Sequence, residues 1–199
     1  MNERSFTINT MHSMDKRTQI LSATEQLIAT RGLDKVSMQQ VAKHAGVAAG
    51  TIYRYFDDKD DLLRQLSAHL MMQCATHIQH GVKDEPTLRD QFERLWRNTW
   101  HMMLQRDHLL LSRDQFEALP RDDHAHTQQE RIAFADLYRV IQQGKDQRLF
   151  KPMDDDVLIT LGLEPAVCLA RKQVRGVITL NDDAIADAIR ACWDAISLH

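Results

Sequence analysis

The spacing of apolar residues constrains the fold more than any other feature of this sequence, because it follows a helical period along most of the chain. The first stripe has members at positions i, i+3, i+4, i+7 and i+8, which share one face of an α-helix. They are Ile20, Ala23, Thr24, Leu27 and Ile28. No sustained alternation of polar and apolar residues indicates a β-strand. The sequence therefore predicts an all-α fold.

Glycines and capping residues divide this pattern into separate helices. Gly32 follows the first helix, and Ser37 with Gln40 forms a capping box at the start of the second. Asp57 and Asp58 suit the N-cap of the fourth helix, and Gly144 is expected to end a later one. The expected helices cover approximately residues 15–31, 37–45, 49–56, 59–80, 88–103, 130–143, 154–175 and 182–198, with a shorter apolar segment around 109–119 that ends at Pro120.

Charge is unevenly distributed, although the net charge is only -3. Residues 14–56 carry six basic against three acidic side chains, whereas residues 65–199 carry sixteen basic against twenty acidic ones. A mildly basic segment on an acidic body would orient that segment toward phosphates.

The composition also limits where the protein acts. No apolar stretch approaches the ~18 residues that a membrane span needs, and residues 1–13 hold no apolar run typical of a secretory signal. We therefore expect a cytoplasmic protein with a flexible tail over residues 1–13 and no membrane partner. The three cysteines are too few and too scattered for a disulfide framework, and we expect core packing for Cys74, Cys168 and Cys192.

The segment over residues 36–56 has the pattern of a helix-turn-helix, with two short helices joined by a turn at Gly46. At about 100° per residue, Ile52 and Phe56 share one side of the second short helix and would pack inward. The opposite side would present Gly50, Thr51 and Arg54, flanked by Tyr53 and Tyr55.

The exposed side of this helix suits DNA. Glycine allows close approach of the backbone, while the threonine and arginine at positions 51 and 54 have hydrogen-bonding groups that match base edges or phosphates. The two tyrosine hydroxyls are placed to reach the sugar-phosphate walls of a groove. Lys59 adds a cation beside the backbone N–H groups of the next helix, where anions bind well. The alternatives are a packed helical hairpin that meets no DNA, and surface charges at Arg54 and Lys59 that only contact solvent.

Residues 20–63 resemble the N-terminal domain of the tetracycline-repressor (TetR) family. The motifs that carry the resemblance are Val41-Ala42-x-x-Ala45-Gly46-Val47, Gly50-Thr51-Ile52-Tyr53-x-Tyr55-Phe56 and Lys59-x-x-Leu62-Leu63. The resemblance implies that the third helix enters the major groove of double-stranded DNA. It further implies that Tyr53, Tyr55 and Lys59 hold phosphates, that Ala49, Gly50 and Thr51 lie against bases, and that Gln39 contributes.

Two residues depart from the family pattern. Ala48 stands where a serine or threonine often caps the recognition helix, which removes about 0.5–2 kcal/mol of local stabilisation. Ala49 offers at most a methyl contact to thymine. We therefore expect base discrimination to depend on Thr51, Arg54 and Gln39.

The rest of the chain carries no catalytic motif that indicates an enzyme. The resemblance implies an all-helical body that binds a small-molecule effector and dimerises. The last two helices support a homodimer independently, because their apolar residues occur on more than one face and must be buried on two sides; deep burial within a monomer is the alternative. Candidate residues for an apolar effector pocket, each of which core packing would also explain, are Trp96, Trp100, Met103, Phe116, Phe134 and Tyr138.

No metal site or cofactor is predicted. Cys74, His77 and His80 follow one another at three-residue intervals, but they span about 120° of helix and no fourth ligand is evident.

Taken together, the sequence predicts a homodimeric, sequence-specific DNA-binding transcription regulator. The leading interpretation is a repressor that a small molecule releases from a palindromic operator, and the alternatives are an activator and a ligand-independent DNA-binding protein. A helical adaptor that binds protein through residues 49–56 also stays open. The expected organisation is a tail over residues 1–13, a helix-turn-helix domain over 14–60, and a ligand-binding and dimerisation domain over 61–199.

Overall fold

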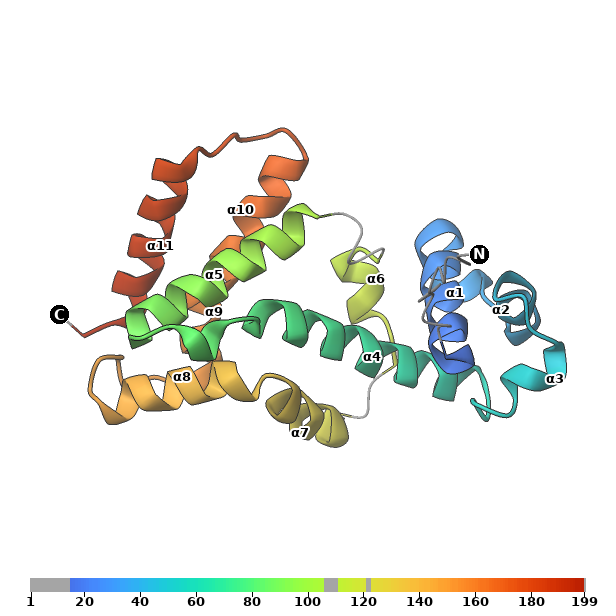
Figure 1. Ribbon diagram of the computed structural model, residues 1–199. Coiled ribbons are helices and arrows are strands. Elements are labelled where there is room, and N and C mark those ends of the chain that lie inside the picture. Colours follow the sequence, from blue (N-terminus) through green and yellow to red (C-terminus); the bar gives the residue numbers. More distant parts are fainter. Residues whose placement is uncertain (1–14, 106–110, 121–122, 199) are drawn as a thin grey trace, which may run out of the picture.

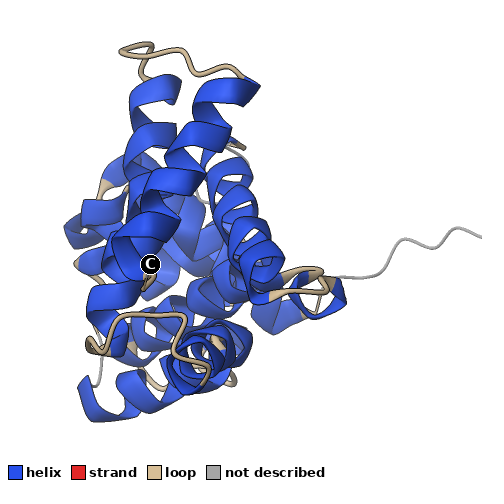
Figure 2. Cartoon of the chain, turned by 90° about the vertical axis from the view of Figure 1, so that its left-hand side faces the viewer, coloured by secondary structure: helices blue, strands red, loops and turns tan. Residues whose placement is uncertain are grey.

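The computed structural model describes residues 15–105, 111–120 and 123–198, and it is built of helices in both views (Figures 1 and 2). No strand occurs among these residues apart from an isolated bridge between Phe150 and Ser197. The predicted all-α fold is confirmed, while the predicted tail over 1–13 lies outside the described residues. The α-helices are α1 (Lys16–Arg31), α2 (Met38–His44), α3 (Ala49–Ile52), α4 (Lys59–Gln79), α5 (Leu88–Leu104), α6 (Arg113–Glu117), α7 (Asp123–Ala133), α8 (Ala135–Asp146), α9 (Asp155–Gly162), α10 (Glu164–Val174) and α11 (Asp182–Ile196), with single 3-10 turns at Leu33–Lys35 and Val82–Asp84.

The first three helices form a small unit at one end of the molecule (Figure 1). All five residues of the predicted α1 stripe are buried, which confirms that stripe. The capping box between Ser37 and Gln40 starts α2 as predicted, and Gly46 adopts a left-handed φ of 66° in the turn that follows. These local signals therefore agree with the packing inside the unit.

Helix α4 runs from this unit into the rest of the chain (Figure 1). The side chain of Asp58 accepts a hydrogen bond from the backbone N–H of Asp61, which confirms the predicted N-cap. The apolar residues of its first half, from Leu62 to Leu70, belong to the core of α1–α3, whereas Met71 and Ala75 pack with Ala133 of α7. The predicted boundary at residue 60 therefore falls in the first turn of a continuous helix.

The larger unit has its own core, built around α5. The indole rings of Trp96 and Trp100 stack on this helix with centroids 5.8 Å apart, and both are buried. Phe92 meets Trp193 of α11 edge to face at 5.4 Å. Such aromatic pairs add about 0.5–1.5 kcal/mol to the area that they bury. None of the described helices is both long enough and apolar enough to span a membrane.

Two of the expected helices are interrupted. The predicted helix over residues 154–175 is wrong as one element, because it breaks at Leu163 into α9 and α10. Pro165 explains the break: it has no N–H to donate and its ring clashes with the preceding turn. The expected helix over 130–143 starts earlier, at Asp123, and breaks at Phe134 into α7 and α8.

Gly144 was expected to end a helix, and that prediction is wrong. This glycine lies inside α8, which continues to Asp146. A Cβ at position 144 would lie 2.1 Å from the ring of Phe150, so the absence of a side chain makes room for a buried aromatic. Glycine was selected here by packing and not by backbone conformation.

Candidate nucleic-acid interface and body cavity

The turn between α2 and α3 is held by contacts to α1. The side-chain amide of Gln19 donates to the backbone carbonyl of Ala45 at 2.8 Å, and His44 pairs with Gln26 at 2.9 Å. Ala48 is the N-cap of α3 and makes no side-chain capping bond, as its sequence identity implies. α3 is therefore a short helix without a side-chain cap, fixed mainly by what lies beneath it.

The inner side of α3 is sealed against the first unit. Ile52 and Phe56 are fully buried, at 0% and 1% exposed, which confirms the predicted orientation. The helix predicted over 49–56 is wrong in its length, because α3 ends at Ile52. The backbone N–H groups of Arg54 and Tyr55 donate to carbonyls three residues back, which tightens the chain into a turn, and Phe56 still donates to Ile52 at 3.1 Å. Burying these two side chains contributes roughly 1.5–3 kcal/mol each.

The outer side of α3 presents the residues that sequence analysis placed there. Tyr53 is 55% exposed, and Arg54 and Ala49 are also exposed, whereas Thr51 is half-buried. A Cβ at Gly50 would meet nothing within 4 Å, so the space above this glycine is open to another molecule. Gln39, at the start of α2, is exposed as well.

Tyr55 and Lys59 are held more closely than the other candidates. Tyr55 packs partly against the core of the first unit, with its ring 6.5 Å from that of Phe56. The ammonium of Lys59 donates to the backbone carbonyl of Leu33 at 3.4 Å, which fixes it near the start of α4. The ring of Tyr55 and the ammonium of Lys59 therefore each have a contact within the protein.

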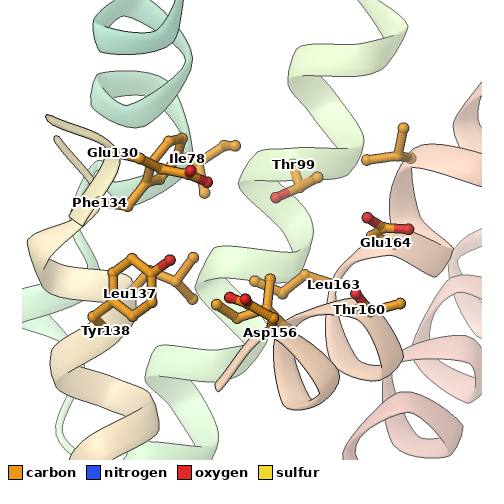
Figure 3. Close-up of a pocket in the computed structure, with 12 residues that line it drawn as sticks. Ile78, Thr99, Glu130, Phe134, Leu137, Tyr138, Asp156, Thr160, Leu163 and Glu164 are labelled. Atoms are coloured by element: carbon orange, nitrogen blue, oxygen red, sulfur yellow. The ribbon is translucent and has the colours of Figure 1, made fainter. Parts of the chain in front are cut away.

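A cavity of about 320 Å³ lies in the larger unit, between α4, α5 and α7–α10 (Figure 3). Its walls are apolar and aromatic, and its polar lining includes Glu130, Asp156 and Glu164. Burial raises the pKa of Tyr138, and the neighbouring charges of Glu130 and Asp156 raise it further, while Arg131 opposes them. The lining residues are Ile78, Thr99, Glu130, Phe134, Leu137, Tyr138, Asp156, Ile159, Thr160, Leu163, Glu164 and Val167.

The six predicted pocket residues separate into three groups. Phe134 and Tyr138 line the cavity. Trp96, Trp100 and Met103 pack in or against the core of the larger unit and are not among the lining residues. Phe116 packs against the core of the first unit instead. The three acidic residues that line the cavity were missed, because nothing in their local sequence distinguishes them from solvent-exposed acids.

Helix α6 connects the two units in a way that sequence analysis did not anticipate. Its Gln115 side chain donates to the backbone carbonyl of Ile28 in α1 at 3.0 Å. Leu111 and Leu119, on either side of α6, are buried in the core of the first unit. The capping box of Ser112 with Gln115 is visible in the sequence, but the contact with α1 spans 87 residues and is not.

A second connection is made by Gln79, the last residue of α4. Its side-chain amide donates to the carbonyl of Ala133, where α7 ends, at 2.8 Å. Its side-chain oxygen accepts from the backbone N–H groups of Asp136 and Leu137, where α8 begins, at 2.7 and 3.1 Å. Gln79 thus occupies the break at Phe134 and satisfies both helix ends.

The cysteines differ in their surroundings. Burial, together with the nearby negative charge of Glu25, raises the pKa of Cys74 to about 11. Cys192 is buried, and its burial also raises its pKa. Cys168 is exposed on α10 in the single chain, so the expectation of core packing is wrong for this residue. Among the described residues, no group of three or more His, Cys, Asp or Glu is arranged to hold a metal ion.

Comparison with known proteins now gives the family. Residues 20–66 match the family described as bacterial regulatory proteins, tetR family, and residues 87–197 match the tetracyclin repressor-like C-terminal domain. A transcriptional regulator of the helix-turn-helix type from Haemophilus influenzae is 30% identical over 92% of this chain and 96% of its own length.

The chain belongs to the TetR family.

Solved structures support the same assignment for the whole chain. A TetR-family regulator from Vibrio parahaemolyticus is 43% identical, with a TM-score of 0.85 over 93% of this chain and 100% of that one. A TetR-family regulator from Haemophilus influenzae is 29% identical, with a TM-score of 0.81 over 92% of this chain and 97% of that one. This TetR-family chain is therefore a helix-turn-helix transcriptional regulator, with a helix-turn-helix domain followed by a larger helical domain.

Proposed function

We propose that this TetR-family regulator is a homodimeric repressor that a small molecule releases from a palindromic operator. The observation that carries the proposal is the two-sided character of α3 and the turn that follows it. Ile52 and Phe56 fix the inner side of this segment, while Tyr53, Arg54 and the open space above Gly50 lie on its outer side. In the proposed complex the tyrosines and Lys59 bind phosphates, and Ala49, Gly50, Thr51 and Gln39 lie against bases.

The proposed dimer forms through α10 and α11, together with α9, at the end of the molecule opposite α3 (Figure 1). In the single chain, α9 leaves Val157 and Leu161 43% and 40% exposed. Cys168 on α10 and Ala191 on α11 are exposed as well. A two-fold interface would cover these groups on both protomers. It would also hold the two α3 helices about 34–36 Å apart, which matches one turn of DNA.

The cavity is the proposed effector site, and two contacts provide a route from it to α3. Ile78 lines the cavity, and the adjacent Gln79 bridges the α7–α8 break, so a ligand that displaces this break would move the end of α4. Gln115 of α6 contacts α1 directly. The ligand shifts the dimer between DNA-bound and released arrangements only by its difference in affinity for the two. The proposed division of the chain is a DNA-binding unit over residues 14–60 and an effector and dimer unit over 61–199.

The chain provides a matched test, because it contains three tyrosines. An operator is first selected from genomic fragments with the purified protein, and its affinity is then measured by fluorescence anisotropy. Replacing both Tyr53 and Tyr55 by Phe removes only two hydroxyls and should weaken binding about 10- to 100-fold, since a hydrogen bond to a charged group contributes roughly 1.5–3 kcal/mol, less when exposed. Tyr138→Phe, the same change in the body, should leave operator affinity unchanged. Equal affinity for the double variant and the parent protein would contradict the proposed interface.

A further inference from the structure

We propose that the effector of this regulator is an amphipathic organic cation, a quaternary or protonated amine attached to an apolar body. This inference rests on the proposed function, because it takes the body cavity as the effector site. It follows from how the charges and apolar surfaces of the cavity are arranged.

The carboxylates of the cavity come from three different helices and line the same space. Glu130 belongs to α7, Asp156 to α9 and Glu164 to α10 (Figure 3); Glu130 and Glu164 are half-buried, and Asp156 is exposed at the cavity's edge. Among the described residues, no ion pair or side-chain hydrogen bond involves any of these three carboxylates. No Lys, Arg or His occurs in the described lining of the cavity.

The acid next to Asp156 in the sequence is paired, whereas Asp156, among the described residues, is not. Asp155, adjacent in sequence to Asp156, is neutralised by Lys145 at 2.6 Å and lies 3.8 Å from Arg131. Asp156 has no such partner. The part of the lining formed by Glu130, Asp156 and Glu164 therefore has a negative potential that a positively charged ligand would neutralise.

Helix ends explain only part of the acidic lining. Asp156 and Glu164 lie in the first turns of α9 and α10, where the helix dipole favours a negative charge. Glu130 lies in the last turn of α7, where the same dipole disfavours one. A negative charge at that place is consistent with binding of a cation.

The remaining walls fit the rest of such a ligand. Phe134 provides an aromatic face for cation–π contact, and Ile78, Leu137 and Ile159 are aliphatic. The ring of Tyr138 already carries the Arg131 guanidinium, 4.7 Å from its centroid, so a ligand cation would meet the ring's other face or its edge. The volume of about 320 Å³ lies at the lower end of the range for small-molecule sites, roughly 300–1,000 Å³. A carboxylate or phosphate group on the ligand would instead face three like charges.

The test compares three probes that share one alkyl chain and differ in head group: decyltrimethylammonium, decanol and decanoate. Isothermal titration calorimetry with the full-length dimer should show the cation binding about 100-fold more tightly than the anion, with the alcohol between them. Glu130→Gln, Asp156→Asn and Glu164→Gln should each weaken binding of the cation about tenfold, which equals ~1.4 kcal/mol. Binding of decanol should stay within about twofold in all three variants.

Asp183→Asn is the matched control, because Asp183 is also an exposed acid in the first turn of a helix but does not line the cavity. This variant should bind the cation as tightly as the parent. The inference is overturned if decanoate binds as tightly as the cation or more tightly. It is also overturned if the cation does not bind at millimolar concentration, or if the three cavity variants bind the cation with unchanged affinity.

Operator release, measured on the same samples by fluorescence anisotropy, separates this inference from the proposed function. If the cation binds as predicted but leaves the operator complex intact, the inferred ligand class is supported, and the proposal that the ligand releases the operator is contradicted. If decanoate binds through the cavity and releases the operator, the proposed function stands and the cationic class fails.

Discussion

Gln79 provides the sharpest test of how the two units are joined, because one side chain satisfies two helix ends. Its amide group makes hydrogen bonds of 2.8 Å to the carbonyl of Ala133, and of 2.7 and 3.1 Å to the N–H groups of Asp136 and Leu137. Replacing it by alanine leaves all three backbone groups without these partners. The substitution itself does not weaken α4, since alanine is the better helix former.

The expected magnitude follows from these three bonds. Each contributes roughly 0.5–1.5 kcal/mol net, so their sum is about 1.5–4.5 kcal/mol. Water can replace part of this, because the site is only half-buried, and the gain in helix propensity offsets a few tenths of a kcal/mol. We therefore expect Gln79→Ala to lower the free energy of unfolding by about 2 kcal/mol, which corresponds to a fall in Tm of roughly 4–8 °C for a chain of this size.

Two measurements check this expectation. Urea denaturation at a fixed protein concentration gives the change in stability. Hydrogen exchange should show the amides of Asp136 and Leu137 losing protection in the variant. Gln73→Ala is the control, because Gln73 is an exposed glutamine on the same helix. If Gln79→Ala is no less stable than Gln73→Ala, and both amides stay protected, the α7–α8 break is not held by α4.

Three further results are expected. Lys59→Ala should weaken binding to all DNA sequences and lower the slope of log affinity against log salt by about 1, and an unchanged slope would remove this residue from the interface. Gly144→Ala should destabilise the protein by about 1–3 kcal/mol in urea denaturation, because its Cβ would overlap the Phe150 ring; a neutral or stabilising effect would contradict that packing. The proposed interface covers Cys168, so in the dimer this thiol should be alkylated at least about tenfold more slowly than in monomers. Leu161→Glu should dissociate the dimer and provide the monomer, and mass spectrometry follows the alkylation of both. Equal rates in a dimer of confirmed mass would place the interface elsewhere.

Local rules were enough to predict the start of α1 and α2 and the turn after α2 in the first unit. The apolar stripe of α1, the capping box at Ser37 and the glycine turn at Gly46 all act over a few residues, and each occurs in the structure as expected. The inward positions of Ile52 and Phe56 follow from helical geometry alone. The family motif lies in this same unit, so its function was also readable from the sequence.

What sequence analysis missed depends on contacts between distant segments. Gly144 looks like a helix end until Phe150 is seen to fill the space beside it. Gln115 contacts α1 across 87 residues, and no local pattern encodes that pairing. Phe116 was predicted as a pocket residue because it is large and aromatic, but the chain path places it against the first unit.

The cavity illustrates the same limit for function. Apolar and aromatic residues predicted that a pocket exists, but they are also what any core contains, and Trp96 and Trp100 pack in the core. The acids that distinguish this cavity from ordinary core come from three helices. Only the folded structure brings these three negative charges to the lining of one cavity.

The most direct measurement is the crystal structure of the dimer bound to its selected operator. We predict that α3 of each protomer lies in the major groove, in half-sites about 34–36 Å apart, with the hydroxyl of Tyr53 about 3 Å from a phosphate oxygen. A complex in which α3 faces solvent and another surface holds the duplex would contradict it.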